Sequence, residues 1–138
     1  MQVKIAKKPF AEGETRLAYH CEIQFQKGWK TWVVKSFKGT GDKGAHSVDQ
    51  YLKQIEVSTI AAHLGNLFNT TAAKPPGCPK VSFLKSHVIS TNSIPARNYC
   101  LEHLLEGTFT KLCKNTGYWN EAALDEQNDR SIVSTQGT

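Results

Sequence analysis

The chain has 138 residues, of which 39% are hydrophobic and 21% are charged. This length is sufficient for one ordinary domain with a core, and this composition excludes an intrinsically disordered chain. The formal net charge of +5 favours anionic partners weakly, but the lysines are scattered, so no nucleic-acid-binding surface is predicted.

The four cysteines are Cys21, Cys78, Cys100 and Cys113. No pair has C-x-x-C spacing and no histidine pair has zinc-ligand spacing, so no metal site is predicted. The amino terminus has no apolar signal-peptide region, and no apolar stretch reaches the ~20 residues of a transmembrane helix. We therefore expect reduced thiols in a cytoplasmic protein with no membrane partner; two disulfides in a secreted domain are the alternative.

The first part of the chain predicts an antiparallel meander. A first strand lies within residues 2–10, and a polar turn around Gly13 follows it. Residues 15–26 show the clearest alternation of apolar and polar side chains in the chain and predict a second strand. After a glycine turn, residues 30–38 predict a third strand, which carries Lys35 between apolar neighbours.

One long helix is predicted after a glycine-rich loop over residues 39–46. Ser47 is a candidate N-cap, and Gln50 would complete a capping box. The helix should end near Phe68 and be covered on more than one side, because two adjoining apolar stripes run along it. Gly65 weakens a helix, so we expect close packing there.

Further strands are predicted after the proline-rich loop at residues 74–79. A fourth strand carries Val81, Phe83 and Val88–Ile89, and a fifth strand carries Tyr99 and its neighbours. From about residue 119 the chain is polar and acidic, which fits a short helix or a frayed tail. The expected fold class is α+β, with an antiparallel twisted sheet of about five strands and one long packed helix.

Lys35 is the one charged residue between apolar neighbours in the predicted third strand, and burial of its side chain in a core is unfavourable. An ammonium group between apolar strand neighbours is either solvated at a sheet edge or held in place as a functional charge. A strand lysine that faces a cleft binds nucleotide phosphates in protein kinases. The order of the predicted elements is also that of a kinase small lobe.

Four blocks of sequence strengthen this comparison: residues 9–19, 32–38, 67–69 and 99–117. The last block reads Tyr-Cys-Leu-Glu-His-Leu-Leu-Glu-Gly-Thr-Phe-Thr-Lys and then Asn-Thr-Gly. The usual kinase G-x-G-x-x-G loop is missing. With these blocks in this order, the chain resembles the alpha-type protein kinases, the atypical group that includes myosin heavy-chain kinase and elongation-factor kinase.

The resemblance implies a nucleotide site for ATP. Lys35 is similar to the family's lysine that contacts the α- and β-phosphates, and Gly13 and Arg16 are similar to its phosphate-side turn. Glu102 and Leu104 are similar to the hinge pair that meets adenine through the backbone. Each residue also has a plainer interpretation: a turn glycine, a solvated strand end for Arg16, or a core residue for Leu104.

The comparison with ordinary kinases suggests a helix partner for the lysine. Glu56 would pair with Lys35 from the predicted helix, and Gln54 is nearly as well placed. An exposed helix carboxylate is the commoner alternative for Glu56.

The family's large lobe carries the catalytic aspartate, the Mg²⁺ ligands and a structural zinc, and no such residues are recognised in this chain. Residues 134–138 faintly resemble the family's Asp-x-Gln-Gly segment, with Ser134 at the aspartate position, or match it by coincidence. No catalytic or metal-binding residue is therefore predicted. The expected organisation is a nucleotide-binding lobe with its hinge over residues 1–118 and a divergent polar tail over residues 119–138.

The resemblance implies the ATP-binding lobe of a protein serine/threonine kinase, truncated and inactive alone. The alternative is a non-catalytic, pseudokinase-like module that binds a protein through an exposed hinge face containing Leu104, Leu105 and Phe109. A nucleic-acid-binding domain has weaker support, from the net charge of +5 and from Trp29 and Trp32. We expect nucleotide and protein partners and no nucleic acid.

Overall fold

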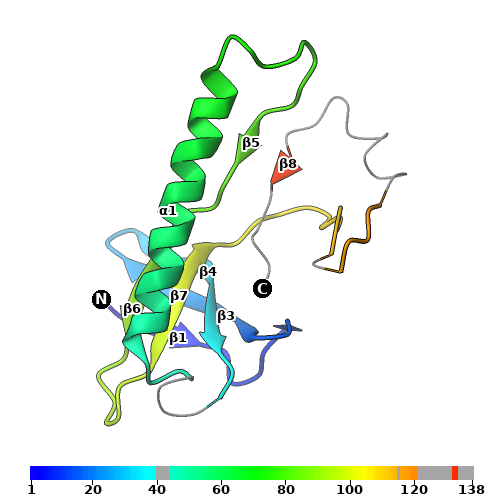
Figure 1. The fold of residues 1–138 in the computed structure, drawn as a ribbon. Helices are drawn as coiled ribbons and strands as arrows, with labels where there is room; N and C mark the ends of the chain where they lie inside the picture. The colour runs from blue at the N-terminus through cyan, green and yellow to red at the C-terminus, as the bar shows by residue number, and fades with distance from the viewer. Residues whose placement is uncertain (40–43, 115, 121–131, 134–138) are drawn as a thin grey trace.

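The computed structural model describes residues 1–39, 44–114, 116–120 and 132–133. It contains one curved sheet, one long helix that crosses it, and a small two-stranded sheet beside the helix (Figure 1). The predicted α+β class, with an antiparallel sheet and one long helix, is confirmed.

The main sheet has six strands in the order β1-β3-β4-β7-β6, with β2 paired to β3. All of these neighbours are antiparallel. The strands are β1 (Val3–Ile5), β2 (Ala11–Glu12), β3 (Arg16–Phe25), β4 (Gly28–Phe37), β6 (Ser86–Ser90) and β7 (Asn98–His103). The strand beyond the expected five is the short β2, which the sequence suggested was part of a turn.

The predicted fourth strand is divided in two by the structure. Its first part, β5 (Val81–Ser82), leaves the main sheet and pairs in parallel with β8 (Ile132–Val133). Asn69 on the helix explains the separation: its Nδ2 donates to the Val81 carbonyl at 2.6 Å, and its Oδ1 accepts from the Val81 amide at 2.8 Å. These two bonds hold β5 to the helix.

The polar tail that was predicted beyond residue 118 returns to this small sheet through β8. The predicted short helix or frayed tail over residues 121–130 lies outside the described residues, as do residue 131 and residues 134–138.

Strand register divides the residues of the sheet between two faces. Directly opposite residues share a face in an antiparallel pair, and side chains alternate along each strand. One face carries the apolar core, formed by Cys21, Ile23, Val34, Tyr99 and Leu101. The other face carries the charged residues of the candidate site, so the sheet separates its apolar core from that site.

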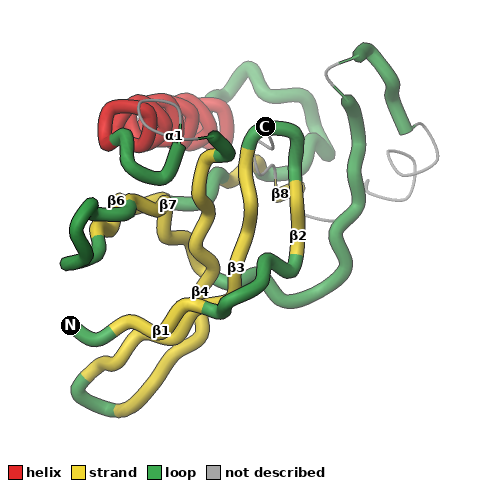
Figure 2. The backbone as a smooth tube through the Cα atoms, turned by 90° about the horizontal axis from the view of Figure 1, so that it is seen from below, coloured by secondary structure: helices red, strands yellow, loops and turns green. Residues whose placement is uncertain are grey.

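Helix α1 (Val48–Thr70) lies over one face of the sheet (Figure 2). This is the charged face, because Tyr51 of the helix contacts Phe37, which shares a face with Lys35 on β4. Tyr51 fixes the first turns of α1, because the amide of Phe37 on β4 donates to the Tyr51 hydroxyl at 2.9 Å and the two rings meet edge to face. Ser47 occupies the N-cap position, as predicted, but its side chain makes no capping hydrogen bond, so the expected capping box with Gln50 is not formed.

The prediction that α1 is covered on more than one side is wrong for the described residues. Its buried residues are Tyr51, Ala61 and Gly65, two of which are small and allow a close approach to the chain beneath. Four of its larger apolar side chains face outward in a stripe with spacing 3-4-3, and they are between 48% and 57% exposed: Val57, Ile60, Leu64 and Leu67. Among the described residues, no helix is long and apolar enough to span a bilayer.

We expect Gly65→Val to destabilise the fold. A Cβ at Gly65 would lie 3.0 Å from two ring carbons of Phe83, so the close packing expected there is confirmed. Overpacking of this kind costs about 1–3 kcal/mol, and urea denaturation measures the loss in the free energy of unfolding. Asn66→Val is the matched control, because Asn66 is exposed on the same turn. Equal losses in the two variants would contradict the packing explanation.

The cysteines should differ sharply in reactivity. All four are free thiols; Cys21 and Cys100 are buried and Cys113 is exposed. Burial raises the pKa of Cys21 and of Cys100 to about 11, which lowers the fraction of reactive thiolate. In a timed iodoacetamide reaction at pH 8 followed by mass spectrometry, Cys113 should be modified first. Cys21 and Cys100 should react only after unfolding, and early modification of either would contradict this order.

Candidate functional site

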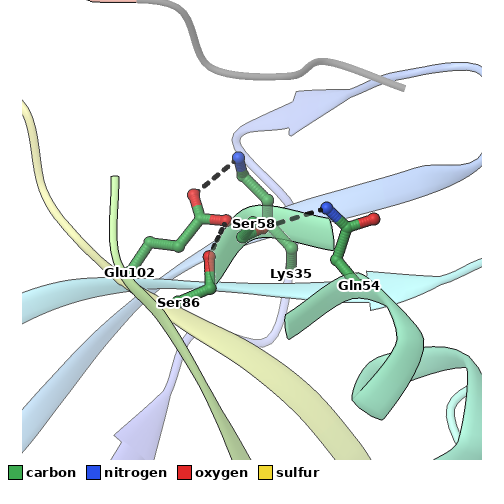
Figure 3. A network of polar contacts seen from close by, with 5 residues as sticks. All are labelled: Lys35, Gln54, Ser58, Ser86 and Glu102. Atoms are coloured by element: carbon green, nitrogen blue, oxygen red, sulfur yellow. Dashed lines mark hydrogen bonds and ion pairs between the residues drawn. The ribbon is translucent and has the colours of Figure 1, made fainter. Parts of the chain in front are cut away.

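Lys35 lies in the interior of the sheet, since its strand β4 is flanked by β3 and β7. Its Nζ is 2.7 Å from Oε2 of Glu102 on β7. The hydroxyl of Ser86 on β6 donates to the other carboxylate oxygen, Oε1, at 3.0 Å (Figure 3). The side chains of Lys35 and Glu102 are only 19% and 9% exposed. The alternative of a solvated lysine on an edge strand is therefore wrong.

The helix does not supply the carboxylate that binds Lys35. Glu56 is exposed on α1, and the ion pair of Lys35 is made with Glu102, so the suggested Glu56–Lys35 pair is wrong. Gln54 and Ser58 are half-buried on α1, and the Gln54 amide donates to the Ser58 hydroxyl at 3.4 Å. The helical period explains the difference, because a residue two positions along turns by about 200° to the far side.

Arg16 adds a second cation to the same face. It pairs with Phe37 across β3 and β4, while Ala18 pairs with Lys35, so the two cations are diagonal neighbours. Arg16 is only 6% exposed, and its guanidinium lies 5.9 Å from the centre of the Phe37 ring. The alternative of a solvated strand end is therefore wrong for Arg16.

The buried thiol of Cys100 lies among these charges. Burial is the main reason that its pKa is raised to about 11, and the charges of Arg16, Glu102 and Lys35 also act on it, the two cations in the opposite direction. Lys35 and Arg16 thus bring two cations to the face that also carries the Glu102 carboxylate. Such a site favours a multiply charged anion such as a phosphate chain.

The turn between β2 and β3 contains Gly13. The Gly13 amide donates to the Arg16 carbonyl at 2.9 Å, and the Lys38 amide donates to the Thr15 carbonyl at 2.8 Å. An ion pair between Lys38 and Glu12 joins the same turn to the end of β4. Gly13 is not among the glycines with positive φ. The backbone angle alone therefore does not require glycine, and the phosphate contact of Gly13 stays a prediction.

Leu104 directly follows β7, where the chain leaves the sheet. It is 37% exposed, so its alternative interpretation as a core residue is wrong. Glu102 lies on β7, and its side chain points to Lys35 on β4. Backbone contacts of Glu102 and Leu104 with adenine stay a prediction.

The sequence analysis missed Ser86 and the side-chain role of Glu102. The alternation along β7 places Glu102 and Cys100 on one face, but their partners depend on the register of β4 and β6, which no local pattern reveals. Within the described ranges, no group of three or more histidine, cysteine, aspartate or glutamate residues is arranged to hold a metal ion. The segment that resembles Asp-x-Gln-Gly, residues 134–138, lies outside those ranges.

Two known alpha-kinases are similar to the chain. Alpha-protein kinase vwkA of Dictyostelium discoideum is 26% identical over 127 residues, which cover 91% of this chain and 20% of that protein. The chain therefore spans about a fifth of the length of this relative. The crystal structure of the C-terminally truncated alpha-kinase domain of myosin heavy chain kinase superposes with a TM-score of 0.68 at 24% identity, covering 86% of this chain and 60% of that one.

The structural likeness, at this identity, establishes the fold: the sheet and helix described above are those of an alpha-kinase domain. The sequence evidence establishes the family, because the model of the alpha-kinase family matches residues 11–135. This match includes the turn at Gly13, both cations and Glu102. The chain belongs to the alpha-kinase family.

Proposed function

We propose that this chain is the ATP-binding lobe of an alpha-type protein serine/threonine kinase. The observation that carries the proposal is the pair of cations, Lys35 and Arg16, on the face of the sheet that α1 covers. Membership of a kinase family supports a nucleotide as the anion. A buried guanidinium and a held ammonium group are suited to bind phosphate oxygens by charge-assisted hydrogen bonds.

Each site residue has a distinct role in this proposal. Lys35 binds the α- and β-phosphates, and Arg16 clamps a phosphate oxygen. The backbone of the turn at Gly13 contacts the phosphates. The backbone of Glu102 and Leu104 meets the adenine edge. ATP brings Mg²⁺ in this family, but no Mg²⁺ ligand is assigned among the described residues.

We further propose that the chain binds ATP without transferring its phosphate. The carboxylate beside the two cations belongs to Glu102, and it is engaged by Lys35 and Ser86. It is therefore not available as a general base for a substrate hydroxyl. We place the nucleotide-binding lobe and hinge in residues 1–118 and the polar tail in residues 119–138, in a cytoplasmic protein without nucleic-acid or membrane partners.

A second candidate function is a pseudokinase-like module that binds a protein. Leu104 and Leu105 directly follow β7, Phe109 lies four residues further along, and all three are exposed. Apolar side chains gathered in one exposed segment favour contact with another protein. In this alternative the partner binds at the hinge face and nucleotide has no effect on its affinity.

Lys35→Ala should weaken ATP binding at least ~10-fold, because a charge-assisted contact to phosphate is lost. Titration with a fluorescent ATP analogue, with and without Mg²⁺, measures the change. Lys30→Ala is the matched control: Lys30 lies on the same strand, is exposed, and has its Nζ 5.7 Å from the centre of the Phe25 ring.

Lys35→Ala leaves the Glu102 carboxylate without its cation. The double variant Lys35→Ala/Glu102→Gln removes both charges, and it is therefore titrated beside the single variant. Circular dichroism establishes that each variant is folded. No saturable binding by the folded wild-type chain, or equal losses in Lys35→Ala and Lys30→Ala, would contradict the proposed nucleotide site.

The purified chain should transfer no phosphate. Incubation with radiolabelled ATP and a serine- and threonine-rich test protein should give no more labelled product than the Lys35→Ala variant gives. Transfer that the wild-type chain performs and Lys35→Ala does not would overturn the proposed inactivity and would support a complete kinase function.

A further inference from the structure

The ion pair of Lys35 has an unusual origin for a kinase lobe. In protein kinases the phosphate-binding lysine of the sheet pairs with a glutamate on the packed helix, and both must be in place for activity. Here the carboxylate comes from the neighbouring strand β7. We propose that Glu102 is a positioning residue: its carboxylate holds the Lys35 ammonium group at the phosphate site, so the sheet rather than helix α1 sets the position of the lysine. This inference rests on the proposed nucleotide function.

Strand register makes the contact possible. Val33 lies opposite Glu102 and Lys35 lies opposite Cys100, so Lys35 and Glu102 are diagonal neighbours on one face. Diagonal partners are about 7–8 Å apart at the backbone, which two long side chains can bridge. The separation of 2.7 Å between Nζ and Oε2 is that of a charge-assisted hydrogen bond.

Ser86 holds the carboxylate from the other side. It lies directly opposite Glu102 on β6, and its hydroxyl donates to Oε1 at 3.0 Å. Each carboxylate oxygen therefore has its own partner, one from β4 and one from β6. Because the Glu102 side chain is only 9% exposed, water competes little for these bonds, and the carboxylate is held in one orientation.

The helix offers no alternative carboxylate to the lysine. Asp49 and Glu56 are the acidic residues of α1, and both are exposed. Gln54 and Ser58, on the half-buried side, are uncharged and are joined to each other. A displacement of α1 would therefore leave the Lys35–Glu102 pair intact.

The pair also leaves Lys35 able to bind phosphate. An ammonium group has three N–H donors, and Glu102 takes one of them, so two remain for phosphate oxygens. Arg16 is a second cation on the same face of the sheet. The carboxylate therefore directs the ammonium group without cancelling the positive charge that attracts a phosphate chain.

The first test compares Glu102→Gln with Glu56→Gln, the same chemical change on the exposed side of the helix. Glu102→Gln should weaken ATP binding roughly tenfold, the scale of one charge-assisted hydrogen bond, and leave adenosine binding unchanged, because the adenine contacts are made by the backbone. Glu56→Gln should change neither affinity. Ser86→Ala should weaken ATP binding in the same direction but less. In a Lys35→Met background, Glu102→Gln should have no further effect.

A second test does not depend on nucleotide. In protein labelled with ¹⁵N-lysine, the ammonium resonance of Lys35 is identified by its loss in Lys35→Arg. An ammonium group held by a partly buried carboxylate is protected from exchange with water, so its resonance should be observed in the wild type and in Glu56→Gln. It should disappear in Glu102→Gln.

The outcomes separate this inference from the proposed function. Unchanged or tighter ATP binding by Glu102→Gln would overturn the inference while the nucleotide site stands. A parallel loss of ATP and adenosine binding with a lower melting temperature would also overturn it, because it would show a purely structural role. No ATP binding by the wild-type chain, with an ammonium resonance that still requires Glu102, would contradict the proposed function and confirm that Glu102 positions Lys35.

Discussion

The antiparallel register of β4 and β7 is the constraint on which the charged site depends. A cation in the interior of a sheet is tolerated only with a partner, because an unpaired buried charge is costly. The register supplies that partner by making Lys35 and Glu102 diagonal neighbours. A slip of one residue would turn Glu102 toward the face that carries Val34 and Leu101, and would place a carboxylate in the apolar core. The apolar core on one face therefore fixes the ion pair on the other.

Helix α1 packs on the charged face through one large side chain, Tyr51, and through small residues further along. Ala61 and Gly65 face the chain beneath, and Asn69 binds the backbone of β5 at the far end. Tyr51 anchors the opposite end on β4. These contacts place α1 over the sheet without a charged contact to Lys35. The placement of α1 over the sheet and the position of the Lys35 side chain thus have separate physical causes.

Local signals in the sequence predicted most of the fold. The alternation over residues 15–26 became β3, and the predicted helix ends differ from those of α1 by at most two residues. The predictions failed where the answer depended on tertiary packing. Asn69 withdraws Val81 from the main sheet through two side-chain bonds that no periodicity reveals. The orientation of α1 followed small residues, whereas the apolar stripes had suggested that the larger ones were buried.

In the candidate site, too, local signals in the sequence identified residues, whereas contacts that depend on tertiary packing were not predicted. Lys35 was conspicuous because a charge interrupted an apolar strand, and Arg16 and Glu102 were identified by resemblance to a family that the chain is now known to belong to. The partner of the lysine was not predictable, because the comparison with ordinary kinases directs attention to the helix. A strand carboxylate performs this task with less dependence on the rest of a kinase domain: β4, β6 and β7 are neighbours in one sheet, so the lysine stays in place for as long as the sheet is folded. Under the proposed function, nucleotide binding and phosphate transfer are therefore separable properties, since binding requires an ordered cation and transfer additionally requires a free carboxylate.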